Sequence, residues 1–146
     1  MPPLDLPTFL PFRLNQLAAD VSRQLAMAYE ERFGIDVPQW RVLATLVDRD
    51  SVTAQEIVES TRTHKSTISR AVQALTDRGL VSSAQHGEDG RARRLALTPK
   101  GRAMTDEIVP LAKGYERDLM ARLDPQAAAR LREGLAALEA ALKGQG

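Results

Sequence analysis

Hydrogen-bonding side chains gather at the beginning of one predicted helix, residues 64–78. They lie on its polar face or near its N-terminal end, and they are Lys65, Ser66, Thr67, Ser69, Arg70 and Gln73. Arginine pairs bidentately with guanine and glutamine with adenine, whereas serine and threonine more often hold phosphates. The segment is therefore predicted to enter the major groove of DNA, with Arg70 and Gln73 contacting bases and the other four setting the register. Any one of these residues alone would be an ordinary surface residue.

A second group of cations follows the acidic turn at 87–90, in what is predicted to be a hairpin tip. Alternation along a strand places Arg91 and Arg93 on one face and Arg94 on the other. Arginine at a hairpin tip can enter the minor groove, and Asp89 is close enough in sequence to orient Arg91 by a charge-assisted hydrogen bond. Asp89, Arg91 and Arg93 are thus predicted DNA contacts, and the alternative is a solubilising loop.

The charge distribution supports this placement. Residues 62–102 carry nine Lys or Arg and three Asp or Glu, whereas the rest of the chain carries eleven basic and sixteen acidic residues. A locally basic segment is typical of a surface that releases counterions from DNA phosphates. A solvated charged face is the alternative.

Two short helices joined by a tight turn position the polar face. The pair Thr53 and Glu56 has the spacing of a capping box and predicts the start of the first helix, and Ser60-Thr61 favours a turn after it. The helix at 64–78 follows, and Gly79 is placed to close it. This order is a helix-turn-helix, and short strands at 80–83 and 95–97 add a hairpin wing.

Longer helices flank this centre. Apolar residues at helical spacing predict one helix over about 12–33, ended by Gly34, and a second helix from Pro38 with Trp40 in its buried stripe. Thr98-Pro99 and Asp124-Pro125 begin two more helices. The first of these is expected to kink at Pro110.

The last helix carries a heptad-like leucine seam, Leu131, Leu135, Leu138 and Leu142. The long terminal helices expose more apolar surface than a small centre can cover, so a homodimer is predicted. The alternative is that they fold back on the core of the same subunit.

The motifs together resemble the MarR family of bacterial transcription regulators. The resemblance rests on 66–72 (STISRAV) with Leu75, on 79–81 (GLV) followed by 89–91 (DGR), and on 97–101 (LTPKG). It implies a mainly α fold with a small β-hairpin wing and a triangular homodimer on a pseudo-palindromic DNA site. Residues 1–34 and 103–146 would form the dimerisation helices, 35–102 the winged helix-turn-helix, and Asp89 with Arg91 the wing-tip pair.

The resemblance also implies a small-molecule effector. Members of the family commonly repress their targets and release DNA when a ligand, often an aromatic acid, binds between the dimerisation and DNA-binding parts. The segments 11–17 (PFRLNQL) and 39–44 (QWRVLA) are similar to those of regulators of aromatic-compound catabolism, some of which sense CoA thioesters. The residues predicted to line such a pocket are Arg13, Asn15, Trp40, Arg41 and Tyr115. Packing or a surface ion pair is the alternative for each.

Other functional classes find little support in the sequence. There is no cysteine, so thiol chemistry and oxidant sensing by that route are excluded, and His64 and His86 lack the spacing of a zinc site. No nucleophile with a base and no phosphate-binding glycine loop appears, so neither an enzyme nor a cofactor is predicted. No signal peptide or membrane span is recognised, and a cytoplasmic location is expected. The rival function is a helical homodimeric interaction protein without specific DNA binding.

Overall fold

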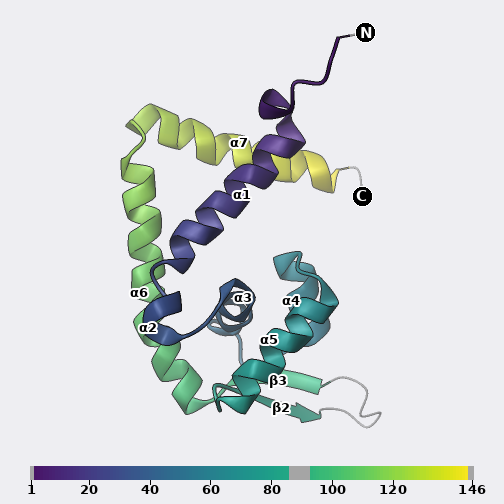
Figure 1. The fold of residues 1–146 in the computed structure, drawn as a ribbon, viewed down its shortest axis with the longest axis vertical. Coiled ribbons are helices and arrows are strands. Elements are labelled where there is room, and N and C mark those ends of the chain that lie inside the picture. Colours follow the sequence, from purple (N-terminus) through teal and green to yellow (C-terminus); the bar gives the residue numbers. More distant parts are fainter. Residues whose placement is uncertain (1, 86–92, 145–146) are drawn as a thin grey trace. The chain divides into compact units, whose positions relative to one another are not determined.

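The computed structural model describes residues 2–85 and 93–144, and by packing the chain divides into two compact units, Met1–Leu111 and Ala112–Gly146. The fold is mainly helical with a small β-hairpin, as the sequence predicts, and the hairpin is part of a three-stranded antiparallel sheet. In chain order the elements are η1 (Leu6–Thr8), α1 (Leu10–Ala26), α2 (Glu30–Phe33), α3 (Val37–Leu46), β1 (Val52–Thr53), α4 (Ala54–Thr61), α5 (Lys65–Asp77), β2 (Val81–Gln85), β3 (Arg93–Leu97), α6 (Pro99–Ala121) and α7 (Pro125–Lys143) (Figure 1).

The predicted helix signals are confirmed at α4, α5 and α7. At α4 the Glu56 amide donates to Thr53 Oγ1 and the Thr53 amide donates to a Glu56 carboxylate oxygen, both at 3.1 Å. At α7 the Ala127 amide donates to Asp124 Oδ1 at 2.8 Å. Gly79, just after α5, is left-handed with φ of 73°, a conformation that glycine adopts without steric cost.

The single helix predicted over 12–33 is wrong. Helix α1 ends at Ala26, and the Ala28 and Tyr29 amides donate to carbonyls only three residues back, at 2.9 and 3.1 Å. This tight turn directs Tyr29 into the core, where its ring centroid lies 5.6 Å from that of Trp40. Burial of an aromatic ring stabilises the turn more than one further turn of regular helix would. The predicted end at Gly34 is confirmed, with φ of 66°.

The predicted hairpin is confirmed, and a third strand joins it. Strands β2 and β3 pair in antiparallel register from Val81 opposite Leu97 to Gln85 opposite Arg93. Strand β1 adds to the other edge of β3, so that the order is β1-β3-β2. This third strand was not predicted, because two residues carry no readable alternation.

One buried cluster holds the first unit together. Helix α3 packs against α5 and α4, and all three contribute side chains with no measurable exposure. Trp40 is half-buried against this cluster, which agrees with the prediction that it belongs to the core. Fully buried members include Leu43, Leu46, Ile57, Ile68, Leu75 and Leu80. Helix α5 thus packs into the core by its apolar face, and its polar face stays accessible.

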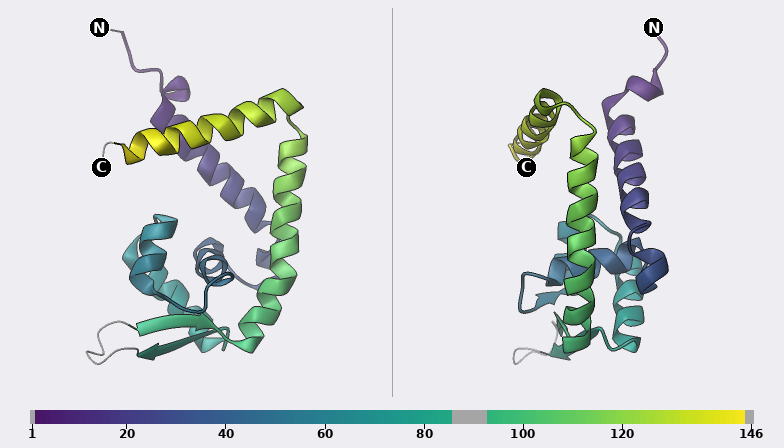
Figure 2. Two further views of the ribbon diagram at one scale, coloured as in Figure 1. Left: turned by 180° about the vertical axis from the view of Figure 1, so that it is seen from behind. Right: turned by 90° about the vertical axis from the view of Figure 1, so that its left-hand side faces the viewer.

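Helix α6 continues through Pro110 as one helix (Figure 2). Pro110 is exposed, and because it has no N–H it cannot donate to the Asp106 carbonyl one turn earlier. In the second unit, the leucine seam of α7 is largely uncovered: Leu131, Leu135 and Leu142 are 44%, 45% and 68% exposed. Within the described residues, no helix has the length and apolar character needed to span a bilayer.

Candidate nucleic-acid interface

Helix α5 begins with a histidine cap. The Ser66 amide donates to His64 Nδ1 at 3.2 Å, and the Ser66 hydroxyl lies 2.9 Å from the same nitrogen. An acceptor at this position satisfies one of the free N–H groups that every helix start leaves. Sequence reasoning considered His64 only as a zinc ligand and rejected that role because the spacing is wrong. The signal that it missed was the position of His64 directly before the first helical residue.

The N-terminal end of α5 exposes the predicted contact residues. Lys65, Ser66, Ser69 and Arg70 are exposed and Thr67 is half-buried, while Ile68 on the same helix is fully buried. Four polar side chains within two helical turns therefore reach solvent from a helix whose apolar face is packed into the core. This is the arrangement that insertion into a DNA groove requires.

Gln73 differs from the other predicted base contact. Its Nε2 donates to Asp77 Oδ1 at 2.8 Å, one turn further along α5. A base contact by this amide would need to break or share that hydrogen bond. Arg70 has no such competitor among the described residues, so it is the better placed of the two for base readout.

Many cations of the basic segment donate hydrogen bonds to oxygens of the protein itself. Arg94 donates to the Ser51 hydroxyl at 2.8 Å and to the Ser51 carbonyl at 3.0 Å, which secures the chain next to β1. Arg102 donates to the Val47 carbonyl at 2.7 Å, at the end of α3. Lys65 and Arg70 have no intramolecular polar partner in the described part of 62–102, so they are the cations left for an external anion.

The wing is only partly described. Arg93 is exposed on β3, and its Nε donates to Ser83 Oγ on β2 at 2.9 Å. The other two predicted wing contacts, Asp89 and Arg91, lie outside the described residues. The hairpin that would carry them is present, and their contacts stay predictions.

The turn between α4 and α5 has a special backbone. Arg62 is left-handed with φ of 54°, and its guanidinium donates to the Glu59 carbonyl. Thr63 follows, and its Oγ1 accepts a hydrogen bond of 3.1 Å from Arg41 Nη1 on α3. Arg41 therefore bridges α3 to the residue just before the cap of α5.

Two of the predicted effector residues lie at one hollow of about 530 Å³. Trp40 and Arg41 line it together with Ala44, Thr45, Asp48, Arg49, Ser60 and Thr61, from α3, its C-terminal end and α4. Arg13 and Asn15 are exposed on α1 and are not among the lining residues, and Tyr115 belongs to the second unit. Sequence reasoning missed Arg49, which adds a second cation to this hollow.

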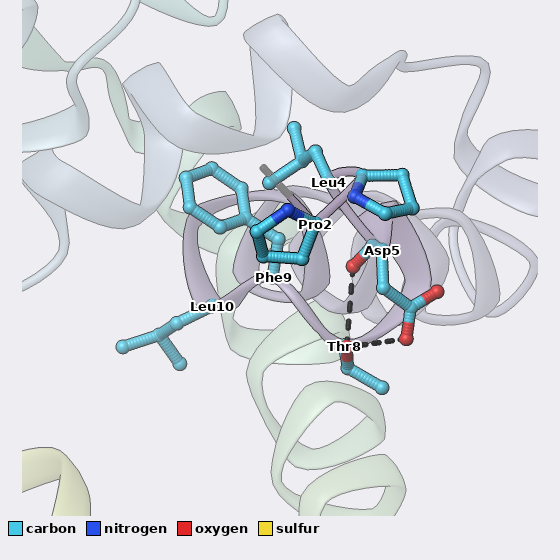
Figure 3. A pocket seen from close by; sticks show the side chains of 7 residues that line it. Pro2, Leu4, Asp5, Thr8, Phe9 and Leu10 are labelled. Atoms are coloured by element: carbon cyan, nitrogen blue, oxygen red, sulfur yellow. Dashed lines mark hydrogen bonds between the residues drawn. The ribbon is translucent and has the colours of Figure 1, made fainter.

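Another hollow, of about 660 Å³, lies at the N-terminal end of the chain (Figure 3). Its polar side chains bond to each other: Thr8 Oγ1 lies 2.6 Å from Asp5 Oδ2 and 3.2 Å from the Asp5 carbonyl. The rest of its lining is apolar, namely Pro2, Pro3, Leu4, Phe9 and Leu10. None of the described residues that line it is a cation, so the hollow beside Trp40 fits an acidic ligand better.

Tyr29, whose ring packs against Trp40, has the clearest shift in pKa among the described residues. Burial raises the pKa of Tyr29 to about 12, with a further increase from the nearby negative charge of Glu30, while Arg41 opposes the shift. The neutral phenol is therefore the form that the fold favours. Within the described residues, no group of three His, Asp or Glu side chains is placed to hold a metal ion.

Known transcriptional regulators resemble parts of this chain in sequence. Residues 33–92 match the model of the MarR family. The transcriptional repressor IacR of Pseudomonas putida is 34% identical over 71 residues, which cover 49% of this chain and 42% of IacR. The transcriptional regulator HosA of Escherichia coli is 22% identical over 89 residues, which cover 61% of this chain and 66% of HosA. The chain thus spans less than two thirds of the length of these relatives.

Solved structures resemble nearly the whole chain. A MarR-family transcriptional regulator from Silicibacter pomeroyi is 28% identical, with a TM-score of 0.82 over 96% of this chain and 99% of its own. BpsR of Bordetella bronchiseptica, whose DNA binding is regulated by 6-hydroxynicotinic acid, is 20% identical with a TM-score of 0.80 over 94% and 98%. At that identity the BpsR likeness concerns the fold alone.

Proposed function

Because residues 33–92 match the model of the MarR family and a solved MarR-family regulator has the same fold over nearly the whole chain, we propose that this chain is a MarR-family regulator, a homodimeric repressor whose α5 enters the major groove of an operator. Members of this family are DNA-binding regulators and not enzymes. The repressor role is proposed because the P. putida relative IacR is a repressor. Release from DNA is assigned to an aromatic acid or its CoA thioester.

The observation that carries the proposal is the exposed N-terminal end of α5. Lys65 and Arg70 reach solvent there, and neither has an intramolecular polar partner among the described residues. The neighbouring cations Arg78, Arg94 and Arg102 all donate to protein oxygens. Cations that the fold does not use, on a rigid helix beside serine hydroxyls, match the needs of phosphate and base contacts.

Homodimerisation is proposed from apolar residues that the single chain leaves uncovered. In the first unit, Leu10, Leu17 and Val21 of α1 are 53%, 56% and 38% exposed. In the second unit, the leucine seam of α7 is exposed in the same way. Large apolar side chains in helical stripes favour a partner helix, and a second copy of this chain supplies matching stripes. Residues 1–34 and 103–146 are accordingly proposed as dimerisation segments, and 35–102 as the DNA-binding region.

The effector site is proposed at the hollow lined by Trp40 and Arg41. Its volume of about 530 Å³ is in the range that small-molecule ligands occupy. An indole ring provides a stacking surface, and Arg49 can pair with a carboxylate. Arg41 can do so through the guanidinium N–H groups that do not donate to Thr63, and Asp48 adds a negative charge to the same lining. Arg13, Asn15 and Tyr115 stay candidates for the part of the ligand that extends beyond this hollow.

Selection of DNA tests the proposed sequence-specific DNA binding. The purified protein is incubated with a random-sequence duplex library, and bound sequences are enriched and measured by fluorescence anisotropy. We expect a two-fold-related site, bound with a Kd of about 10⁻⁸ M or tighter at physiological salt. Arg23→Ala on α1, where the arginine pairs only with Asp20 among the described residues, is expected to bind equally well. A stable dimer that enriches no sequence would instead support a helical interaction protein.

A thermal-shift screen tests the effector proposal. Aromatic acids and their CoA esters that bind the native protein raise its Tm. The same compounds should lower the affinity for the selected duplex, and Arg41→Met should weaken both effects. If compounds that bind leave DNA affinity unchanged, the regulatory role assigned to this hollow is wrong.

A further inference from the structure

The side chain of Arg78 connects the C-terminal end of α5 to the end of α2 by hydrogen bonds. Arg78 Nη1 donates to the Gly34 carbonyl at 2.9 Å and Nη2 donates to the Phe33 carbonyl at 3.0 Å, more than forty residues earlier in the chain. Carbonyls at a helix end lack partners within the helix, so a guanidinium that binds two of them makes a directional contact. The planar fork of arginine fixes orientation as well as distance.

Hydrogen bonds also connect the C-terminal end of α5 to the beginning of α6. Lys100 Nζ donates to the Arg78 carbonyl at 3.0 Å, and the Thr98 hydroxyl donates to the Gly79 carbonyl at 2.6 Å. Gly101 allows the close approach, because a Cβ there would lie 2.0 Å from the Leu80 carbonyl oxygen. The C-terminal end of α5 is therefore held from two sides, while its N-terminal end is the exposed one.

We propose that Arg78 is a positioning residue that sets the direction of α5 relative to α1 and α2, and thereby the half-site spacing that the dimer accepts. The proposal rests on the proposed function, in which α1 belongs to the dimerisation segment. Only residues 27–29 separate α1 from α2, so a dimer contact on α1 is close in the chain to the carbonyls that hold Arg78.

The length of α5 explains why this contact matters at the other end. A helix of 13 residues is about 20 Å long, so a rotation of about 10° at Arg78 moves its N-terminal end by about 3 Å. Hydrogen bonds to base edges tolerate only a few tenths of an ångström. Loss of the Arg78 contact should therefore widen the range of half-site spacings more than it weakens any single half-site.

The test compares duplexes in which two copies of the selected half-site are set at the preferred spacing or one base pair further apart. One base pair rotates one half-site by about 34° about the DNA axis, since a turn contains about 10.5 base pairs. Wild-type protein should lose about 100-fold or more in affinity, because bivalent binding is lost when geometry forbids it. Arg78→Met should lose about tenfold or less, and Arg78→Lys, which keeps one cationic group, should fall between them.

Arg102→Met is the matched control. Arg102 also donates from its guanidinium to a carbonyl at the end of another helix, Val47 after α3, but it does not contact α5. Its loss should lower the Tm by a similar amount and leave the spacing discrimination at the wild-type value. If Arg78→Met is unfolded, Arg78→Lys decides the outcome.

Three results would overturn the assignment. Wild-type discrimination in a folded Arg78 variant would show that the contact does not set α5. Equal loss of discrimination in Arg78→Met and Arg102→Met would show a general effect of lower stability. Failure of the wild-type protein to select any duplex would refute the proposed function itself, which the variant comparison does not address.

Discussion

Arg41 Nη1 and Thr63 Oγ1 are joined by a hydrogen bond of 3.1 Å that connects α3 to the turn before α5. Thr63 is followed directly by His64, the cap of α5, and Arg41 also lines the hollow beside Trp40. One side chain therefore touches both the proposed effector hollow and the turn that leads into the proposed DNA-binding helix.

The Arg41–Thr63 bond is expected to contribute to stability as a pair. In a double-mutant cycle, Arg41→Met and Thr63→Val should show a coupling free energy of about 1 kcal/mol, the usual size for a hydrogen bond with partial exposure. Urea unfolding of the four proteins measures it. Thr8→Val, which removes a hydroxyl that bonds only to Asp5 among the described residues, should be additive with Arg41→Met. Additivity for Thr63→Val as well would mean that the contact contributes nothing.

Two glycine-to-alanine changes should have opposite effects. At Gly101 a Cβ would lie 2.0 Å from a backbone oxygen, so Gly101→Ala should lower the free energy of unfolding by about 3 kcal/mol or more. At Gly134 in α7 nothing lies within 4 Å of the added carbon, so Gly134→Ala should raise it by about 0.5 to 1 kcal/mol. Thermal unfolding of the two variants checks both signs, and tolerance of Gly101→Ala would refute the close contact between α6 and the segment after α5.

The raised pKa of Tyr29 predicts that the protein loses stability in alkali. Its pKa is about 10 in the unfolded chain and is raised to about 12 in the folded protein. Below pH 10 the phenol is protonated in both states, and its contribution to the free energy of unfolding is fully present. As the pH rises from 10 to 12, only the unfolded chain releases the phenol proton, so the free energy of unfolding falls. The difference in unfolding free energy between wild type and Tyr29→Phe should therefore shrink by about 2 kcal/mol over that interval. Tyr115→Phe is the control variant. A difference between wild type and Tyr29→Phe that stays constant with pH would exclude this linkage.

The leucine seam of α7 should be needed for dimerisation. Leu135→Asp would bury an unpaired carboxylate between two copies, so the sedimentation coefficient should fall to that of a monomer at micromolar concentration. Ala129→Asp adds the same charge about 180° away from Leu138 on the helix and should leave the dimer intact. A dimeric Leu135→Asp variant would show that the copies meet elsewhere.

Most of the first unit could be predicted because its signals are local. Capping residues, left-handed glycines and apolar spacing located the starts and ends of α3, α4 and α5 within a few residues. The break after Ala26 could not, because no proline or glycine marks it and its cause is the contact of Tyr29 with Trp40 eleven residues later. Strand β1 was also missed, since its only evidence is pairing with β3 more than forty residues away.

The candidate site, like the fold, could be predicted only where local sequence signals determine it. Exposure of Lys65, Ser66, Ser69 and Arg70 follows from helical periodicity and agrees with the expectation. Which cations the fold uses for itself does not follow from periodicity. Arg78 and Arg94 form hydrogen bonds with residues more than forty positions away, and only the tertiary structure reveals that these charges are occupied.

The most direct test of DNA binding through α5 is the salt dependence of affinity for the selected duplex, measured by anisotropy between about 50 and 200 mM KCl. The wild-type protein should weaken steeply as salt rises. Lys65→Ala should reduce the slope of log affinity against log salt by about 1, and Arg70→Ala should cost about tenfold or more in affinity. Equal slopes and equal affinities for wild type and both variants would contradict the assignment of α5 as the DNA-binding helix.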